Sequence, residues 1–309
     1  MPTQRTQRNT KAGLELLDPA VLSRVGGLEL VARSVVDGFM GGTHKAPTFG
    51  STTDFAEHRA YMPGDDPRRV DWRLFGRSDR LHVKEYEADS NATVAVLLDV
   101  SKSMDYSGAK ERLTKFDYAR VLAASILWLA RQQRDRVSLV TFDAKVREFV
   151  SPSGKHLPMA LHVLEQTRAS GEGAIDAPLR AAADQFRRRG ILVVISDLYH
   201  EPQAAVDAVL RLRTRGSELL LLHVLDPVER QFPAGDVTGL QDLETGETLP
   251  IVSRAMRDEY RAMVAAHVAE LERLSAARGI TYALMETTTP PGEALARVLS
   301  LRERLGPVR

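Results

Sequence analysis

The pattern of hydrophobic and polar positions changes at about residue 93. From there, short apolar runs alternate with segments whose apolar residues recur every three or four positions. This is the pattern of buried parallel strands separated by helices, so it predicts a doubly wound α/β domain. We expect strands at 93–98, 137–142, 191–195, 219–225 and 280–285, a hairpin strand at 146–150, and helices at 116–134, 156–168, 177–189, 203–215, 253–277 and 292–304.

Two stretches differ from this alternation. Before residue 93 the pattern predicts an interrupted helix over 14–39, whose second part stops at Gly38, and a polar, irregular stretch over 54–90 with one strand at 81–86. Residues 226–250 interrupt the α/β pattern as an insertion. The helix after it is predicted to bury one apolar face, which comprises Met256, Tyr260, Met263, Val264, His267, Leu271 and Leu274.

Composition and charge narrow the function classes. The chain has 309 residues, with 42 basic and 41 acidic side chains, so its net charge of +1 gives no general attraction to nucleic acid or to a membrane. It contains no cysteine, which excludes disulfides, thiolate metal sites and thiol catalysis. Since no run reaches the roughly 18–20 apolar residues of a membrane span, and no apolar segment follows the basic start, we expect a cytoplasmic protein without direct membrane insertion.

The segment Asp99-Val100-Ser101-Lys102-Ser103 carries the sharpest local signal for chemistry. It follows the first strand of the α/β pattern, at the strand end where open α/β sheets place ligands. Asp197 follows another buried strand, so the two acids are expected to meet at one edge of the sheet. Carboxylate and hydroxyl oxygens are the ligands that Mg²⁺ or Mn²⁺ prefers. The alternative is that Asp99 and Ser101 simply cap the next helix.

Two motifs carry a resemblance to known families. The segment 99–104 resembles the metal-ion-dependent adhesion motif of von Willebrand factor A domains, which implies Asp99, Ser101 and Ser103 as metal ligands. Asp197, at the other strand end, is the candidate second carboxylate, which would act directly or through water. An earlier block is similar to the signature of the Domain of Unknown Function 58 family; its residues are Arg59, Tyr61, Gly64, Asp65, Asp66, Arg68, Asp71 and Trp72. The resemblance implies a von Willebrand factor A-type, Rossmann-like doubly wound, mainly parallel sheet with a small β-rich N-terminal extension.

The resemblance sets the expected domain limits. We expect a disordered basic tail over 1–13, a helical and β-rich extension over 14–91, and the α/β domain over 92–305 with its 226–250 insertion. Such domains usually take a further metal ligand from a loop threonine, which is absent between 170 and 176. Ser170, Glu172 or Asp176 is the candidate substitute, and a site that binds metal weakly or not at all is the alternative.

The signature block has two readings. Its alternating charges, which are Asp65, Asp66, Arg68, Arg69, Asp71 and Arg73, favour an ion-pair network that fixes the extension to the α/β domain. A partner surface or an acid–base site is the alternative. The block is characteristic of the family, but the resemblance assigns it no chemical role.

The resemblance implies a non-enzymatic binding module without catalytic residues. Related proteins are often associated with MoxR-type AAA+ ATPases, so we expect an adaptor or chaperone-like protein that couples a client protein to such an ATPase. The chain has no phosphate-binding loop motif and is not expected to bind a nucleotide. Two alternatives stay open: a metal-dependent hydrolase that uses Asp99 and Asp197, and a structural domain with a degenerate metal site.

Overall fold

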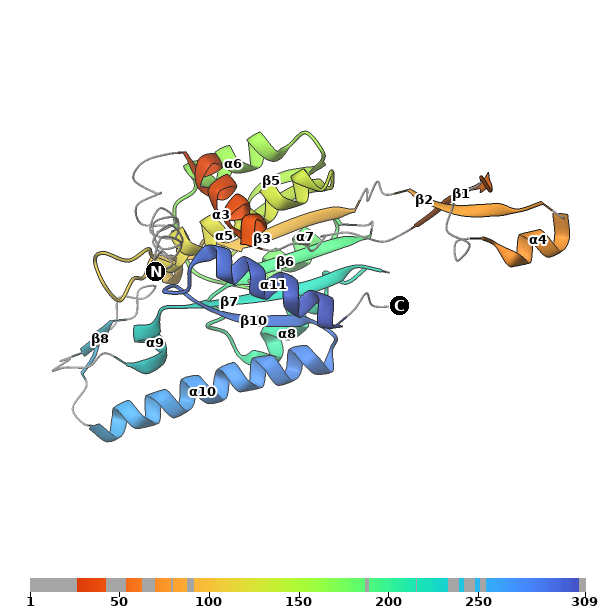
Figure 1. The fold of residues 1–309 in the computed structure, drawn as a ribbon. Coiled ribbons are helices and arrows are strands. Elements are labelled where there is room, and N and C mark those ends of the chain that lie inside the picture. Colours follow the sequence, from red (N-terminus) through yellow and green to blue (C-terminus); the bar gives the residue numbers. More distant parts are fainter. Residues whose placement is uncertain are drawn as a thin grey trace, which may run out of the picture.

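The computed structural model describes residues 27–42, 54–62, 70–78, 80–87, 92–186, 189–214, 216–232, 239–241, 248–250 and 254–305. Within these ranges a six-stranded sheet forms the centre of the molecule, with helices on both of its faces (Figure 1). The predicted α/β class is therefore confirmed.

The sheet has the order of a doubly wound fold. Its strands are β3 (Thr93–Asp99), β4 (Arg136–Phe142), β5 (Val146–Ser153), β6 (Gly190–Ser196), β7 (Glu218–Leu225) and β10 (Thr281–Glu286), in the spatial order β10-β7-β6-β3-β4-β5. Counted along the chain this is the order 3-2-1-4-5-6, whose switch point lies between β3 and β6. All pairs are parallel except the hairpin of β4 and β5. Every residue of β3 is buried, which explains its uninterrupted apolar run.

Each face of the sheet has its own hydrophobic core. One face is covered by α3 (Leu28–Gly42), α5 (Lys115–Gln132), α6 (Leu157–Gln166) and α11 (Pro291–Leu305). The other face is covered by α7 (Asp176–Ala183), α8 (Pro202–Leu210) and α10 (Arg254–Ala277). The predicted helix over 177–189 ends earlier, at Ala183, because Phe186 turns into this second core and packs edge-on against Phe149.

Helix α3 belongs to the core of the α/β domain, whereas the sequence analysis grouped it with the extension. Val31, Ala32, Val35 and Val36 are buried among the side chains of α5 and α11. The helix also continues through Gly38 to Gly42. Phe39 and Met40 pack against the same core, so burial of the next turn outweighs the cost of a glycine in the helix.

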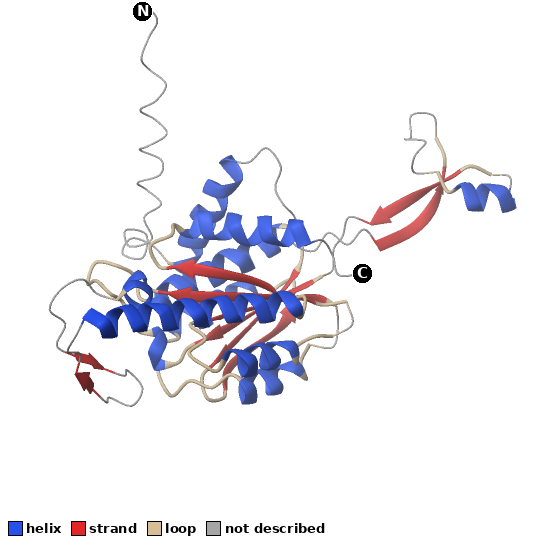
Figure 2. Cartoon of the chain, turned by 90° about the horizontal axis from the view of Figure 1, so that it is seen from below, coloured by secondary structure: helices blue, strands red, loops and turns tan. Residues whose placement is uncertain are grey.

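Between α3 and β3 the chain makes an excursion that we call the arm, residues 54–87. Strands β1 (Asp54–Ala60) and β2 (His82–Glu87) form an antiparallel hairpin, and the short helix α4 (Trp72–Ser78) lies at its tip. The arm extends away from the end of the sheet where β3 begins (Figures 1 and 2). The strand predicted at 81–86 is confirmed, but β1 and α4 were not predicted, because their sequences are polar and short.

Helix α10 is only partly buried, so the prediction of one continuous buried face was wrong for its first half. Leu271 and Leu274 are buried, whereas Met256 and Met263 are 45% and 64% exposed. The second half of the helix packs on α8 and β10. The first half contacts α9 (Pro227–Gln231), and the ring of Tyr260 packs edge-on against Phe232 directly after that helix. The insertion also holds the strand pair β8 (Gly239–Gln241) and β9 (Thr248–Pro250).

Candidate functional site

The motif residues lie where the first strand of the sheet ends. Asp99 is the last residue of β3, and Ser101 and Ser103 follow in a tight turn that contains a short 3₁₀ helix, Lys102–Met104. Leu98 on β3 pairs with Ile195 on β6, so the residues that follow these two strands meet at the switch point of the sheet. This register brings Asp197 beside Asp99, as the sequence predicted.

Asp99 is held by two hydrogen bonds and is 2% exposed. Its Oδ1 accepts from the backbone N–H of Ser101 at 2.9 Å, and its Oδ2 accepts from the hydroxyl of Ser196 at 2.6 Å. The hydroxyl oxygens of Ser101 and Ser103 lie 3.0 Å apart. A carboxylate and two hydroxyls thus gather in one turn; that they bind a metal stays a prediction.

The surroundings of Asp99 disfavour the charged form of its carboxyl group. Burial raises the pKa of Asp99 to about 7, and the charge of Asp197 adds to the rise, although hydrogen bonds from Ser196 and Ser101 oppose it. Near neutral pH the Asp99 carboxyl therefore holds a proton for part of the time. A divalent cation placed at this turn would remove the repulsion and favour the ionised form.

Asp197 is bound by a buried lysine that the sequence analysis did not identify. The ammonium of Lys115, at the first position of α5, lies 2.8 Å from Asp197 Oδ2 and 2.8 Å from Glu229 Oε1 of α9. Lys115 is fully buried. Burial alone would lower its pKa, but the attraction of Asp197 and Glu229 outweighs burial, and the pKa rises. Lys115 is therefore a permanent internal cation beside the motif.

Two aromatic rings complete the surroundings of the Lys115 ammonium. Its Nζ lies 4.6 Å from the ring centroid of Tyr199 and 5.8 Å from that of Tyr106, distances at which a cation is attracted to a ring face. Tyr199 is 48% exposed and lies directly after the β6 end. The lysine thus links the motif loop, the end of β6 and α9 in one polar cluster.

The start of the 226–250 insertion lies against the motif loop. Asp226 caps α9 and accepts from the Thr287 hydroxyl at 3.0 Å. A Cβ on Gly108 would come within 2.5 Å of Asp226 Oδ1 and of a Val228 methyl, so α9 packs closely on the loop between β3 and α5. Most of the rest of the insertion is outside the described residues.

The loop expected to supply a substitute ligand runs beside the motif. Ser170 donates its backbone N–H to Val100 O at 2.7 Å, and Gly171 O accepts from Lys102 N at 2.9 Å. The side chains of Ser170 and Glu172 are exposed. Asp176 lies on α7 and forms ion pairs with Arg180 and Arg211, so its carboxylate is engaged away from the motif.

The described residues contain no group of three or more histidine, aspartate or glutamate side chains that could hold a metal ion. A cation here would instead depend on the Asp99 carboxylate and the two serine hydroxyls, with Asp197 at its side. That donor set, all hard oxygens, fits Mg²⁺ or Mn²⁺.

The signature block lies on the arm. Asp71 caps α4, because its Oδ1 accepts from the N–H groups of Arg73 at 3.0 Å and Leu74 at 3.1 Å. Tyr61 donates its N–H to Leu81 O at 3.0 Å, and Trp72 is 62% exposed. Arg59 lies in β1, where its side chain is outside the described structure, as are Gly64, Asp65, Asp66 and Arg68 as whole residues.

Sequence reasoning missed three residues of this site: Lys115, Ser196 and Glu229. Ser196 had a signal, since it is a polar residue at the end of an apolar run and directly precedes Asp197. Lys115 and Glu229 had none, because a lysine before an apolar helix and a glutamate in an insertion are both normally solvated.

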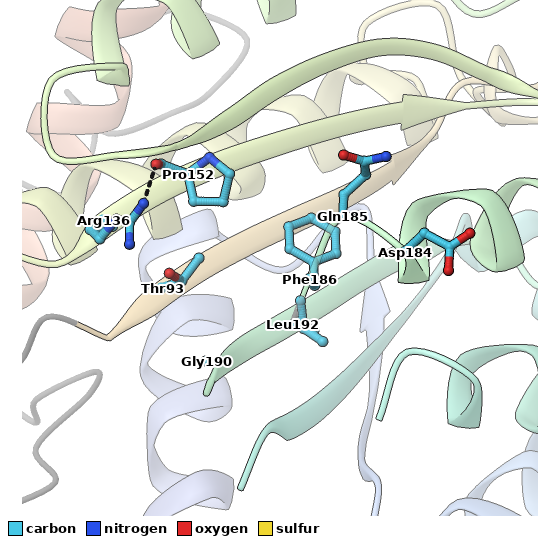
Figure 3. A pocket seen from close by; sticks show the side chains of 8 residues that line it. All are labelled: Thr93, Arg136, Pro152, Asp184, Gln185, Phe186, Gly190 and Leu192. Atoms are coloured by element: carbon cyan, nitrogen blue, oxygen red, sulfur yellow. Dashed lines mark hydrogen bonds between the residues drawn. The ribbon is translucent and has the colours of Figure 1, made fainter. Parts of the chain in front are cut away.

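A cavity of about 530 Å³ lies at the opposite edge of the sheet, where β3 and β6 begin (Figure 3). Thr93, Gly190 and Leu192 line it, and the Arg136 guanidinium at its side donates to Pro152 O at 2.7 Å. It is remote from the motif, and it brings together none of the predicted site residues.

Comparison with known proteins identifies the family. The model of the family described as "Protein of unknown function DUF58" matches residues 57–270. The chain is 30% identical to the uncharacterized protein Rv1480 of Mycobacterium tuberculosis over 268 residues, which cover 83% of this chain and 81% of that protein. It is equally similar to the uncharacterized protein Mb1516 of Mycobacterium bovis.

Solved structures are similar to about two thirds of the chain. An aerotolerance-related membrane protein from Bacteroides fragilis matches with 16% identity, 68% of this chain, 100% of its own and a TM-score of 0.48. BatB of Bacteroides thetaiotaomicron matches with 17% identity, 69% of this chain, 98% of its own and a TM-score of 0.44. The VWA domain of SpRpn10 matches with 10% identity, 71% of this chain, 99% of its own and a TM-score of 0.42.

The helices of the described residues do not match a membrane span. Among the described residues, none forms a helix that is both long and apolar enough to cross a bilayer.

The fold of the protein is consistent with its family. The order of the strands, with its single antiparallel hairpin at one edge, confirms the von Willebrand factor A-type arrangement predicted from the motif. With a family model that matches more than half of the chain, and relatives aligned over most of their length, the protein belongs to the DUF58 family.

Proposed function

We propose that this protein is a non-enzymatic protein-binding module whose partner docks at the carboxyl edge of the sheet. The observation that carries the proposal is the pair of hydroxyls of Ser101 and Ser103, 3.0 Å apart, beside the buried carboxyl of Asp99. Asp99, Ser101 and Ser103 would hold a divalent cation, and Asp197 would act directly or through water. The cation would supply an open coordination position for an acidic side chain of the partner.

The chain's own residues prepare this edge for binding. Ser196 and the Ser101 N–H orient the Asp99 carboxyl, so its oxygens are fixed before any partner arrives. Lys115 fixes Asp197 and the start of the insertion. The exposed ring of Tyr199 stands beside this cluster, and tyrosine is enriched among the residues that dominate binding interfaces.

The expected partner is a MoxR-type AAA+ ATPase, and the protein would act in the cytoplasm as an adaptor that brings a client protein to it. This proposal comes from the family resemblance. A binding role also suits the site chemically. A hydrolase would need a general base within reach of the substrate, and Asp176, one of the few candidates, is engaged by two arginines.

A second candidate is a domain that functions without metal. Lys115 already pairs with both Asp197 and Glu229, so the polar cluster has an internal cation of its own. In that case the edge would bind its partner through the tyrosines and the remaining charges, with no dependence on magnesium.

The test is capture of the purified MoxR-type ATPase from the same organism, in Mg²⁺ and in EDTA. Wild type is compared with Ser103→Ala and with the matched variant Ser107→Ala, which removes a hydroxyl from the same loop outside the motif. Capture that needs Mg²⁺ and is lost only in Ser103→Ala supports the metal-dependent role. Capture under all conditions supports the metal-free candidate, and no capture under any condition refutes this partner.

A further inference from the structure

Helix α4 at the tip of the arm is exposed to an unusual extent. It contains no buried residue, and Trp72 is 62% exposed. Trp72, Arg73, Gly76 and Arg77 are all exposed and fall within roughly 140° of the helix circumference, at 3.6 residues per turn, so they form one outward side. Leu74 and Phe75 are half-buried on the other side. We call the outward face, together with Arg80, the tip patch.

The three arginines of the tip patch have no acid partner in the part of the chain that the structure describes. Arg73, Arg77 and Arg80 form no ion pair with any other residue that the structure describes. Some arginines of the α/β domain do pair with acids: Arg230 pairs with Glu286, and Arg302 pairs with Glu218 at 2.5 Å. Arg73 and Arg77 on α4, and Arg80 just after it, are therefore three guanidinium groups without a described acid partner, close in the sequence to an exposed tryptophan.

The patch is held in place. A helix of seven residues does not form alone in water, yet Asp71 caps this one, and the backbone of Asp71 donates to His82 O at 2.9 Å. Val70 forms a bridge with Val83, and both are buried. A fixed patch loses little conformational entropy on binding, so it can bind more tightly than a flexible one.

We propose that the tip patch is a second protein-binding surface, which takes a short acidic segment of a partner protein with an apolar side chain next to the acids. Guanidinium groups bind carboxylates through paired hydrogen bonds, and tryptophan and arginine are the side chains that most often dominate interfaces. A Cβ placed on Gly76 meets no atom within 4 Å, so an incoming chain can approach the helix backbone there. The surface is separate from the Asp99 edge and needs no cation.

The charge of the arm favours a peptide over a nucleic acid or a membrane. Residues 54–87 contain eight acids and seven bases, so the arm has no broad positive field. Nucleic acids and anionic membranes are bound through many phosphate contacts or clusters of like charge. Two arginines on one short face, with Arg80 just after the helix, instead suit a few carboxylates at close range.

Trp72 itself can report the binding. The chain has two tryptophans, and Trp128→Phe leaves Trp72 as the only one. Trp128 Nε1 has no hydrogen-bond partner in the described structure, so this change removes no hydrogen bond. The probe is a set of short synthetic peptides, each with several Glu or Asp residues next to Leu or Phe, titrated at low salt in EDTA.

We expect at least one acidic peptide to shift the Trp72 emission to shorter wavelength and to protect it from acrylamide. Gly76→Glu should weaken that affinity by roughly tenfold or more, because it adds an acid among the three arginines. Gly154→Glu is the matched control. It also places a glutamate at an open glycine, but on the α/β domain, and should leave the affinity unchanged.

Several results would overturn the proposal. One is a change in Trp72 emission with lysine peptides, a single-stranded oligonucleotide or anionic vesicles that is as strong as the change with acidic peptides. Another is self-association of the protein that Gly76→Glu abolishes. A third is Trp72 emission that is already shielded from acrylamide before any peptide is added. The absence of a response to every acidic peptide would also overturn it. Because the titration is done in EDTA, its failure is distinct from failure of the metal-dependent role.

Discussion

Removal of the internal cation offers the sharpest test of how the candidate site is built. Lys115→Met keeps the length and the apolar stem of the side chain but deletes the ammonium that lies 2.8 Å from both Asp197 and Glu229. Asp197 is 2% exposed, so water cannot replace the lost partner. The variant leaves two acids in a buried cluster that already contains Asp99.

The magnitude follows from the burial of this cluster. Breaking a buried ion pair by removing one partner costs about 3–5 kcal/mol. A domain of this size loses roughly 2–4 °C of melting temperature for each kcal/mol, so the variant should melt roughly 6–20 °C lower at pH 7. The exposed Lys110 lies nearby, and Lys110→Met should leave the melting temperature nearly unchanged.

The pH dependence has a definite sign. The pKa of Lys115 is raised in the folded protein, so its contribution is complete below its ordinary pKa and is lost only as the pH rises through the raised value. In Lys115→Met the stranded acids can take up protons, so the loss of stability should shrink as the pH falls from 8 to 5. Adding Asp197→Asn to Lys115→Met should restore part of the lost stability.

Calorimetry or circular dichroism from pH 5 to 8 measures the melting temperatures of the variants and of wild type. The reasoning is refuted if Lys115→Met melts within about 2 °C of wild type at pH 7, which would mean that the pair contributes as little as an exposed one. It is also refuted if Asp197→Asn adds its own loss to that of Lys115→Met, since independent sites add and coupled ones do not.

Three further changes test other parts of the structure. In EDTA, the free energy of unfolding of Asp99→Asn should rise relative to that of wild type by up to about 4 kcal/mol by pH 8. The reason is that Asp99 has a folded pKa of about 7, so the stability from this group is present below pH 4 and is lost as the pH rises through 7. Urea unfolding at pH 5 and pH 8 measures the difference between variant and wild type, and an equal difference at both pH values would contradict the prediction. Gly190→Ala should cost about 1–3 kcal/mol, since its Cβ would come within 2.5 Å of Thr93 O between β6 and β3; an unchanged urea midpoint would exclude this close approach. Asp71→Ala should remove the α4 cap at a local cost of about 1 kcal/mol, seen as faster amide exchange in the arm with no change in the α/β domain; protection equal to that of wild type would count against the cap.

The sequence predicted the α/β domain well because its strands are buried on both faces. A run such as Val94 to Leu98 has no polar position, and such runs occur at the right spacing for a parallel sheet. The arm was harder to predict. Helix α4 contains no buried residue, so the structure of the arm depends on a helix cap at Asp71 and on the pairing of β1 with the distant strand β2.

The candidate site was predictable only in part. Asp99, Ser101, Ser103 and Asp197 could be found because each lies at or just after the end of a buried strand. The ion pair of Asp197 with Lys115 could not be predicted, since a lysine buried as the partner of two acids looks in the sequence like any lysine at the start of a helix. The unburied first half of α10 was missed for a related reason: periodicity shows which side chains share a face but not how far the neighbouring elements extend.

The position of α3 determines how the molecule can be cut into stable pieces. Because this helix packs on α5 and α11 before the chain enters the arm, the arm is an insertion within a domain rather than a separate leading domain. A fragment limited to residues 57–270 would lose α3, β10 and α11 together. It would bare the apolar side of α5 and leave β7 as an open edge strand, a known route to aggregation. The piece that should stay soluble keeps Leu28 to Leu305 and replaces the arm with a short loop.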